Sequence, residues 1–395
     1  MPPRSRTLVA GAARADITPA LPCMLSGYAA RNHPHDGVHD PISVRALYLR
    51  DRRGAEALVV VADILWYGED AAAAARREIG AQLGLTPGRV LVAGTHTHSA
   101  PSPGGRALRA FEKQGVPCGN AEWVRTLVAQ SVAVAAAAKL RARPAILRVA
   151  RGESFIGINR RERRVSDGRI VLGKNPGGAC DRGIVGLAVD GTDRKPIARV
   201  GNFACHGVVM GQESYKVSGD WPGLAARLIE RRHGGAPFLF VQGGAGNINP
   251  RIGPQNRFGP AVQLAAEFAR DFAAVERRWK PAPSPHREVG GKLRRVALPA
   301  KAGGTRPVLI QRLDLGPVRI VAYPGEAFTE TAMAAKRADT RRTVMFSSCN
   351  GAGDRGYVPV REVFSDGGYE VDVTPYGPDA EGQLRDSLIR LATAE

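Results

Sequence analysis

The chain has 395 residues, of which 44% are hydrophobic and 24% charged, as expected of a globular protein with a large core. Its 56 lysines and arginines exceed its 37 aspartates and glutamates, and the formal net charge of +19 favours anionic partners in general. The basic residues are scattered and no nucleic-acid-binding signature is present, so we expect no nucleic-acid partner.

Short apolar runs alternate with amphipathic segments along the chain. In chain order, strands are expected at residues 44–49, 57–63, 90–93, 145–149, 197–203, 238–241, 288–298, 308–313, 318–323 and 344–347. Helices are expected at residues 69–83, 121–140, 221–232, 260–277, after residue 326 and at residues 379–394. This alternation predicts an α/β fold with a mixed rather than a purely parallel sheet. We expect one domain over residues 1–395, with a weak internal boundary in the proline-rich segment at residues 281–285.

Several classes of protein are disfavoured by what the sequence lacks. The five cysteines are widely spaced and form no CxxC pair, which argues against a disulfide framework and a cysteine-type zinc site. The N-terminal segment has no apolar core of the kind found in signal peptides. The most membrane-like stretch, residues 132–138, is too short to span a bilayer. We therefore expect a cytoplasmic protein without a transmembrane segment, whose oligomeric state the sequence does not indicate.

The sequence GTHTHS at residues 94–99 directly follows the predicted strand at residues 90–93. If the chain stays extended beyond that strand, His96 and His98 point to the same side, because side chains alternate with period two. Two imidazoles at the end of a strand suit a metal site or acid/base chemistry.

Other polar clusters lie at predicted strand ends or in glycine-rich turns, where α/β proteins usually place their active sites. Each has a simpler explanation: Asp220 can cap a helix, Glu326 can complement a helix dipole, and His206 can be a core histidine. Tyr357 and Tyr369 can be packing residues. Together, two histidines and a glutamate at three strand ends provide three ligands with an open position, as in catalytic zinc sites. The clusters are residues 202–207 (NFACHG), 218–223 (SGDWPG), 323–326 (YPGE) and 350–357 (NGAGDRGY).

Two common site types do not fit the sequence. The glycine-rich segment at residues 243–246 is followed by no Gly-Lys-Ser/Thr and lacks dinucleotide-binding spacing. No GxSxG nucleophile elbow occurs. An amidohydrolase barrel with an HxH motif stays an alternative, although it needs further histidines and His233 and His286 stand in poor contexts for that role.

These motifs, in this order, resemble the neutral/alkaline non-lysosomal ceramidase family, from residues 11–19 (GAARADITP) to Tyr369. The resemblance implies a mixed-sheet α/β catalytic domain and a zinc-dependent amidase that cleaves the N-acyl bond of a small or lipid-like substrate. The matching motifs are residues 94–101 and 202–207 for the family's two histidine motifs, 324–326 for its glutamate motif, and 357–360 with Tyr369 for its tyrosine segment.

The resemblance also implies the roles of individual residues. The Zn²⁺ ligands would be His96, His206, Glu326 and Tyr357. The residues that line the site and bind the reacting carbonyl would be His98, Arg160 and Tyr369. The expected chemistry is attack of a metal-activated water on an amide carbonyl, with His98 moving the proton to the leaving amine. Asp220 or Asp63 is expected to orient a ligand histidine.

This chain departs from the family pattern in ways that bear on its substrate. Residues 246–250 (GNINP) align with the family's Gly-Asp-Val-Ser-Pro motif, so Asn249 stands in place of the active-site serine. An asparagine is no nucleophile but can donate a hydrogen bond to substrate. We also expect no C-terminal immunoglobulin-like domain and no secretion signal. These departures favour an N-acyl substrate other than ceramide. A metal-dependent hydrolase of an ester or lactone, and a non-catalytic protein that binds anions or lipids, remain alternatives.

Overall fold

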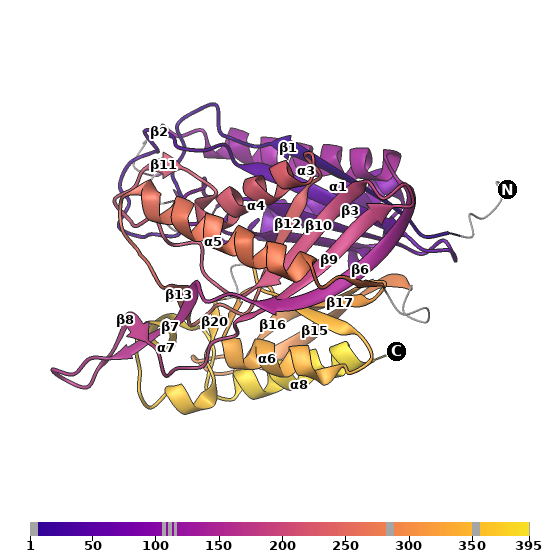
Figure 1. The fold of residues 1–395 in the computed structure, drawn as a ribbon. Helices are drawn as coiled ribbons and strands as arrows, with labels where there is room; N and C mark the ends of the chain where they lie inside the picture. The colour runs from indigo at the N-terminus through magenta and orange to yellow at the C-terminus, as the bar shows by residue number, and fades with distance from the viewer. Residues whose placement is uncertain are drawn as a thin grey trace.

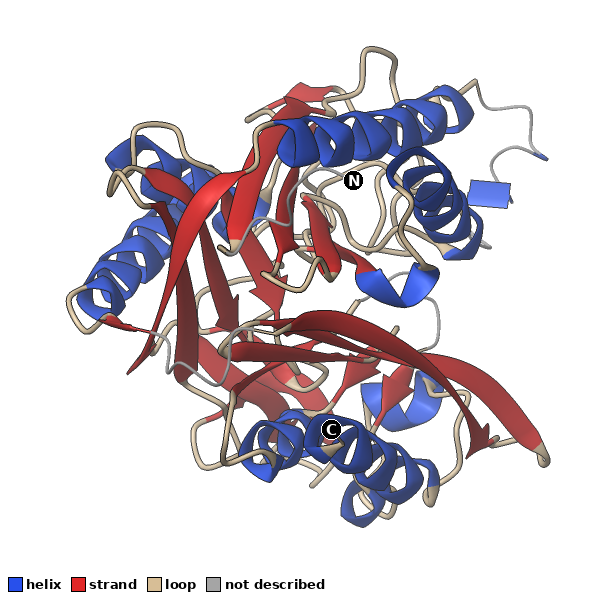
Figure 2. Cartoon of the chain, turned by 90° about the vertical axis from the view of Figure 1, so that its right-hand side faces the viewer, coloured by secondary structure: helices blue, strands red, loops and turns tan. Residues whose placement is uncertain are grey.

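Two β-sheets pack face to face in the middle of the molecule, and helices cover their outer faces (Figures 1 and 2). The computed structural model describes residues 7–104, 108–109, 113, 117–281, 288–349 and 356–394. Within these residues the two halves of the large sheet and the small sheet share one inner apolar core, and three further cores lie between these sheets and the helices outside them.

The large sheet has nine described strands in the order β12–β10–β9–β6–β1–β3–β4–β5, with β14 paired to β6. Its neighbours are antiparallel except for β10 with β12 and β4 with β5. The mixed sheet predicted from the sequence is confirmed. Its strands are β1 (Val9–Asp16), β3 (Ser43–Arg50), β4 (Glu56–Ala62), β5 (Val90–Gly94), β6 (Arg143–Glu153), β9 (Gly183–Gly191), β10 (Pro196–Phe203), β12 (Phe238–Gln242) and β14 (Lys280–Pro281).

The small sheet packs against the large one through alternate side chains. On β17, Ile320 faces the large sheet, whereas Val321 faces the helices on the other side. This period of two explains why each strand contributes to two separate cores. The strands lie in the order β15 (Val289–Pro299), β16 (Thr305–Leu315), β17 (Val318–Ala322) and β19 (Thr343–Ser347).

The long helices cover the sheets from outside in three pairs. Apolar side chains of the first two helices pack on one half of the large sheet, and those of the next two on the other half. The last two long helices cover the small sheet (Figure 1). No helix in the described part of the chain combines the length and the apolar character needed to cross a bilayer. In this order the helices are α1 (Glu69–Leu83), α3 (Asn120–Leu140), α4 (Asp220–Arg232), α5 (Phe258–Glu276), α6 (Thr329–Ala338) and α8 (Ala380–Thr393).

Short elements complete the fold, and most of the candidate site lies on them or on the loops beside them. Three further sheets have two or three short strands each. They pair β2 (Gly37–Val38) with β11 (Lys216–Val217), β7 (Gly157–Arg163) with both β8 (Ile170–Asn175) and β13 (Ile248–Pro250), and β18 (Glu326–Ala327) with β20 (Tyr357–Val358). The short helices are η1 (Pro87–Arg89), η2 (Arg361–Val363) and α7 (Tyr369–Val373).

The strands that the sequence pattern did not predict include β1 and β9, which are rich in glycine and alanine. A Cβ atom at Gly11 would lie 2.1 Å from the carbonyl oxygen of Ala138 on α3, so this strand needs small residues where the helix packs closely. The layered sheets show that the barrel alternative is wrong. Residues 282–287 lie outside the described residues, so the domain boundary at 281–285 stays a prediction.

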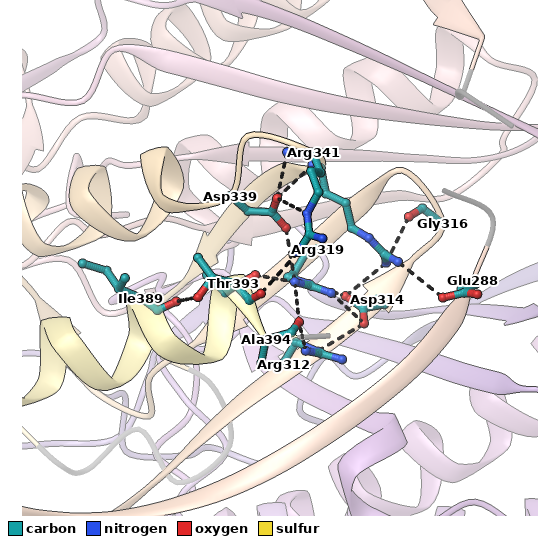
Figure 3. A network of polar contacts seen from close by, with 12 residues as sticks. Glu288, Arg312, Asp314, Gly316, Arg319, Asp339, Arg341, Ile389, Thr393 and Ala394 are labelled. Atoms are coloured by element: carbon teal, nitrogen blue, oxygen red, sulfur yellow. Dashed lines mark hydrogen bonds and ion pairs between the residues drawn. The ribbon is translucent and has the colours of Figure 1, made fainter. Parts of the chain in front are cut away.

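A buried network of charged groups joins the small sheet to the end of α8 (Figure 3). Arg319 on β17 forms ion pairs with Asp314 (Nε–Oδ1, 2.6 Å) and Asp339 (Nη1–Oδ2, 3.2 Å). It also donates hydrogen bonds to the carbonyl oxygens of Ala392 and Ala394. These carbonyls lie at the C-terminal end of the helix, where backbone acceptors have no partner within the helix. Arg319 therefore fixes α8 against the sheet.

Candidate metal centre

Three histidine rings meet at the ends of the strands of the large sheet. His96 and His98 follow β5, and His206 follows β10. The ring centroid of His96 lies 4.5 Å from that of His206 and 5.1 Å from that of His98. One nitrogen from each ring lies within 4.8 Å of the other two. The structure therefore brings together side chains that are about 110 positions apart in the sequence, and a parallel bridge between Thr97 and Gly207 joins the two segments.

Glu326 reaches the same point from β18, which belongs to the two-stranded sheet with β20. Its Oε2 atom lies 2.9 Å from Nε2 of His206 and 3.3 Å from Nε2 of His96. Glu326 Oε2 and His96 Nε2 are nevertheless buried without a hydrogen-bond partner, as are both ring nitrogens of His98. Buried polar atoms normally have partners. Nitrogen and oxygen atoms that converge without hydrogen bonds between them fit the ligand shell of a metal ion.

Backbone carbonyl groups orient two of the histidines. Nδ1 of His206 lies 3.0 Å from the carbonyl oxygen of Ile248, and Nδ1 of His96 lies 3.3 Å from that of Leu65. The Sγ atom of Cys349 is also 3.1 Å from Nδ1 of His96. A proton held on Nδ1 leaves the lone pair of Nε2 free to face the centre of the cluster.

The electrostatics of the cluster suit metal ligands. Burial raises the pKa of Glu326, but the charge of His96 and the contact with His206 hold it well below its usual range. Burial and Arg160 lower the pKa of His206 to about 4. Burial also lowers the pKa of His98 well below 6.5, as do His96 and His206. An ionised carboxylate beside neutral imidazoles is the protonation state that metal binding requires.

His96 itself is different, because burial lowers its pKa but Cys349 and Glu326 raise it to about 10. A proton on His96 and a metal ion compete for the same nitrogen and for the same carboxylate charge. Metal binding at this site should therefore release a proton.

The two histidines of the GTHTHS segment converge for a reason that the sequence pattern did not predict. β5 ends at Gly94, and His96 adopts the left-handed conformation with φ 69°. The extended chain assumed from period-two alternation is therefore wrong. Contacts across the fold hold the turn, since the N–H of His96 donates to Ile64 and that of His98 to Gly207. A non-glycine residue in this conformation carries strain of the kind often found at active sites.

Gly27 presses against the ring of His98, which makes it a test of the position of that ring. A Cβ atom at Gly27, where φ is +95°, would lie 2.4 Å from Cγ and Nδ1 of His98. We expect Gly27→Ala to lower kcat by ~10–100-fold because the ring must move, whereas the metal content stays the same. Steady-state kinetics and metal analysis check this expectation.

Gly84→Ala is the matched control for that substitution. Gly84 ends α1 with φ +71°, and a Cβ atom there would meet no other atom within 4 Å, so the backbone strain is similar but no site residue is touched. This control should lose some stability and keep its kcat. An unchanged kcat in Gly27→Ala would show that the position of His98 does not matter for turnover.

Glu326 and Tyr357 are brought side by side by a short parallel pair of strands. Glu326 on β18 is the direct partner of Tyr357 on β20. Glu326 does not open a helix as predicted, because α6 begins at Thr329 after the chain has made this pair. Tyr357 is buried, which raises the pKa of its hydroxyl well above the usual value. Most of the glycine-rich cluster at residues 350–357 lies outside the described residues.

Arg160 on β7 also lies next to His206. Its Nη1 atom is 3.4 Å from Nε2 of His206 and 3.3 Å from Oδ1 of Asn249, to which it donates. Its guanidinium carbon lies 5.3 Å from the ring centroid of Tyr357 and 5.8 Å from that of Tyr369. Tyr369 is 44% exposed, at the start of α7. The structure thus gathers every predicted site residue into one cluster.

A pocket of about 680 Å³ adjoins the histidines, a size typical of small-molecule sites. Two aromatic residues of its wall contact the cluster: the ring centroid of Tyr28 lies 5.1 Å from that of His98, and Trp66 lies 6.2 Å from His96. Neither Tyr28 nor Trp66 was predicted as a site residue, because a single aromatic residue in a loop gives no periodic pattern in the sequence. Its wall also includes Met24, Leu25, Ser26, Arg31, Leu65, Glu69, Asp70, Ser102 and Arg109.

Asp220 does not act as a helix cap or orient a histidine, and both predictions are wrong. α4 starts at Asp220 itself, and no side-chain cap is formed. The carboxylate instead accepts hydrogen bonds from the backbone N–H groups of Val209, Met210 and Trp221. It holds the loop after His206, whose carbonyl oxygen accepts from the indole of Trp221. The other candidate, Asp63, accepts from Arg45 and from the backbone N–H of Ser43.

The buried carboxyl of Asp220 should make stability depend on pH. Burial raises its pKa from 3.8 to about 6, against its backbone hydrogen bonds. Between these values the folded protein keeps a proton that the unfolded chain releases, so the free energy of unfolding falls as the pH rises, by at most ~3 kcal/mol. Asp220→Asn does not titrate and should lack this decrease. Denaturant midpoints of both proteins at pH ~4 and ~6.5 measure the difference, and parallel curves would contradict the prediction.

The chain is similar to proteins of known family. The model of the family described as neutral/alkaline non-lysosomal ceramidase, N-terminal, matches residues 8–257. Neutral ceramidases A and B of Dictyostelium discoideum are 25% identical over 264 residues and 26% identical over 268 residues. These alignments cover 62% and 63% of this chain but only 36% of each relative.

Solved structures show the same fold. The neutral ceramidase from Pseudomonas aeruginosa superposes with a TM-score of 0.82 at 17% identity, covering 99% of this chain and 74% of that chain. A ceramidase in complex with C2 superposes with a TM-score of 0.83, again at 17% identity, covering 75% of that chain. The α/β class predicted from the sequence is confirmed. By the match over residues 8–257, this protein belongs to the neutral/alkaline non-lysosomal ceramidase family.

Proposed function

We propose that this protein is a zinc-dependent hydrolase that cleaves the amide bond of an N-acyl compound. The observation that carries the proposal is the convergence of buried ring and carboxylate atoms of His96, His98 and Glu326 that have no hydrogen bond, next to Nε2 of His206, which lies 2.9 Å from Oε2 of Glu326. Membership of the ceramidase family supports hydrolysis of an amide rather than another reaction.

The proposed ligands are His96, His206, Glu326 and Tyr357, which offer two nitrogens and two oxygens. A fifth position would stay open to water or substrate, as in other catalytic zinc sites. Zinc held there supplies a Lewis acid and lowers the pKa of a bound water from ~15.7 toward ~7. The pairing of Glu326 with Tyr357 across β18 and β20 keeps the two oxygen ligands together.

The remaining residues would act on the substrate. His98 has two free ring nitrogens and lies beside both ligand histidines, so it can move a proton to the leaving amine. Arg160 has a buried Nη2 group without a hydrogen bond, and Tyr369 exposes its ring close to it. Both can donate to the oxygen of the carbonyl under attack, and one such donor can contribute ~3–4 kcal/mol to the transition state.

The substrate is proposed to be an N-acyl compound other than ceramide. Asn249 stands where the family has its active-site serine, and its Oδ1 accepts a hydrogen bond from Arg160. This contact gives Asn249 a role in holding Arg160 in addition to any contact with substrate. The pocket wall carries both apolar and charged residues, including Glu69 and Asp70, which suits a substrate with a polar part.

Metal analysis and a substrate panel test the proposal. The purified protein should hold about one zinc per chain. It should release the amine from at least one of a short-chain N-acyl sphingosine, an N-acyl ethanolamine and an N-acyl amino acid, and lose this activity on chelation. Turnover confined to p-nitrophenyl esters or lactones would make it a hydrolase of another bond. Absence of both metal and turnover would favour a binding protein.

A further inference from the structure

Glu370 joins the helix that carries Tyr369 to the strand that carries Arg160. It is fully buried on α7 (0% exposed), one position after Tyr369. Its Oε1 accepts from Nε of Arg160 at 2.8 Å, and its Oε2 accepts from Nη1 of Arg161 at 2.6 Å. Arg161 also donates to the carbonyl oxygen of Gly367, just before α7.

We propose that Glu370 is a positioning residue for the reaction, which aims the free N–H group of Arg160 at the substrate and seats Tyr369 beside it. The inference rests on the proposed function, because it assigns Glu370 a role through Arg160 and not through a contact of its own with substrate or metal.

The geometry of the guanidinium group supports this role. The group is planar, so two fixed nitrogens determine the direction of the third. Nε of Arg160 donates to Glu370, and Nη1 donates to Oδ1 of Asn249. Nη2 of Arg160 is buried and has no hydrogen bond of its own. Its direction is therefore fixed by the other two nitrogens of the group. Without Glu370, the side chain of Arg160 could rotate about its last bonds and pair elsewhere.

The position of Tyr369 depends on the same carboxylate. Gly368, with φ +93°, brings α7 so close to the β7–β8 pair that a Cβ atom there would lie 2.8 Å from Ile170 and 3.3 Å from Arg161. The ion pair of Glu370 with Arg161 holds this close approach. The buried carboxylate of Glu370 thus fixes the positions of Arg160 and Tyr369, the two proposed donors to the substrate carbonyl. These two residues come from segments about 210 residues apart in the sequence.

Glu370→Gln tests the inference, because glutamine keeps the shape but removes the charge that both arginines need. On the N-acyl amide turned over fastest in the panel, kcat should fall by ~10–100-fold with little change in KM, and zinc content should stay the same. Binding of inorganic phosphate to the zinc-loaded protein, measured by calorimetry, should weaken by ~10-fold, because a tetrahedral anion needs the same Arg160 donor.

Glu381→Gln is the matched control. Glu381 is a similarly buried glutamate on α8 that pairs with Thr331 and Arg385, away from the site. This control should lose comparable thermal stability but keep its kcat and its phosphate affinity. Equal losses of kcat in Glu370→Gln and Glu381→Gln would overturn the inference, since a purely structural effect would then explain both.

A double variant separates this inference from the proposed function. If Glu370 acts through Arg160, Glu370→Gln should lower kcat by clearly less in an Arg160→Lys background than in the parent protein, because only the effect through Tyr369 is left. Additive losses would overturn the positioning role. If Arg160→Lys lowers kcat and phosphate affinity but Glu370→Gln does not, the positioning role alone is overturned. If Arg160→Lys has no effect on either quantity, both the role of Arg160 in the proposed function and the inference fail.

Discussion

Replacement of His206 by alanine is expected to remove the bound metal and to lower kcat/KM by ~10³-fold or more. His206 lies at the centre of the cluster, with its Nε2 atom 2.9 Å from Oε2 of Glu326 and 3.4 Å from Nη1 of Arg160. The substitution also removes one of the two histidine contacts of the buried Glu326 carboxylate and leaves the contact with His96.

Metal analysis of the purified variant and steady-state kinetics measure this result. His233→Ala is the control, because His233 ends α4 and pairs with Glu276 through its Nε2 atom at 2.6 Å, outside the cluster. It should keep both metal and activity. A metal-free His206→Ala protein that still turns over substrate would disprove the metal-dependent scheme, as would a variant that keeps one zinc per chain.

Arg319→Ala is expected to lower the free energy of unfolding by ~3–5 kcal/mol, because it leaves two buried carboxylates with fewer cations. Arg319 is 3% exposed and pairs with Asp314 and Asp339 (Figure 3). The same substitution removes a donor to the carbonyl groups of Ala392 and Ala394 at the end of α8, so the helix should also detach more easily from the small sheet.

Urea unfolding monitored by fluorescence and circular dichroism measures the loss. Arg143→Ala is the control: its ion pair with Asp193 joins side chains that are 37% and 48% exposed, and such surface pairs contribute at most ~1 kcal/mol. Similar losses in the two variants would show that burial of the Arg319 network does not determine its contribution. The zinc content of Arg319→Ala should stay that of the parent protein, since the network lies outside the site.

Much of the fold could be predicted because its longer elements are locally periodic. The helix at residues 69–83 has the predicted bounds, since an alanine-rich segment with acidic residues in its first turn needs no distant partner to define it. β1 was missed because its small residues are required by α3, which packs on it from a distant part of the chain. Patterns within a short window of sequence carry no information about such contacts.

The candidate site divides in the same way. The motifs around His96, His206, Glu326 and Tyr357 were recognisable in the sequence, because each is a short cluster of chemically specific residues. Their tertiary arrangement was not. The turn at His96 is held by a hydrogen bond to Ile64, and this long-range contact replaces the extended chain that alternation suggested.

The sequence by itself thus determined the α/β class, the family and the residue types available for a metal site. The tertiary structure decided how they meet: the β18–β20 pair sets Glu326 beside Tyr357, and Glu370 bridges two arginines of β7. Buried ion pairs and parallel pairings between distant segments leave no local pattern, because their stability comes from desolvation and geometry that exist only after the chain has folded.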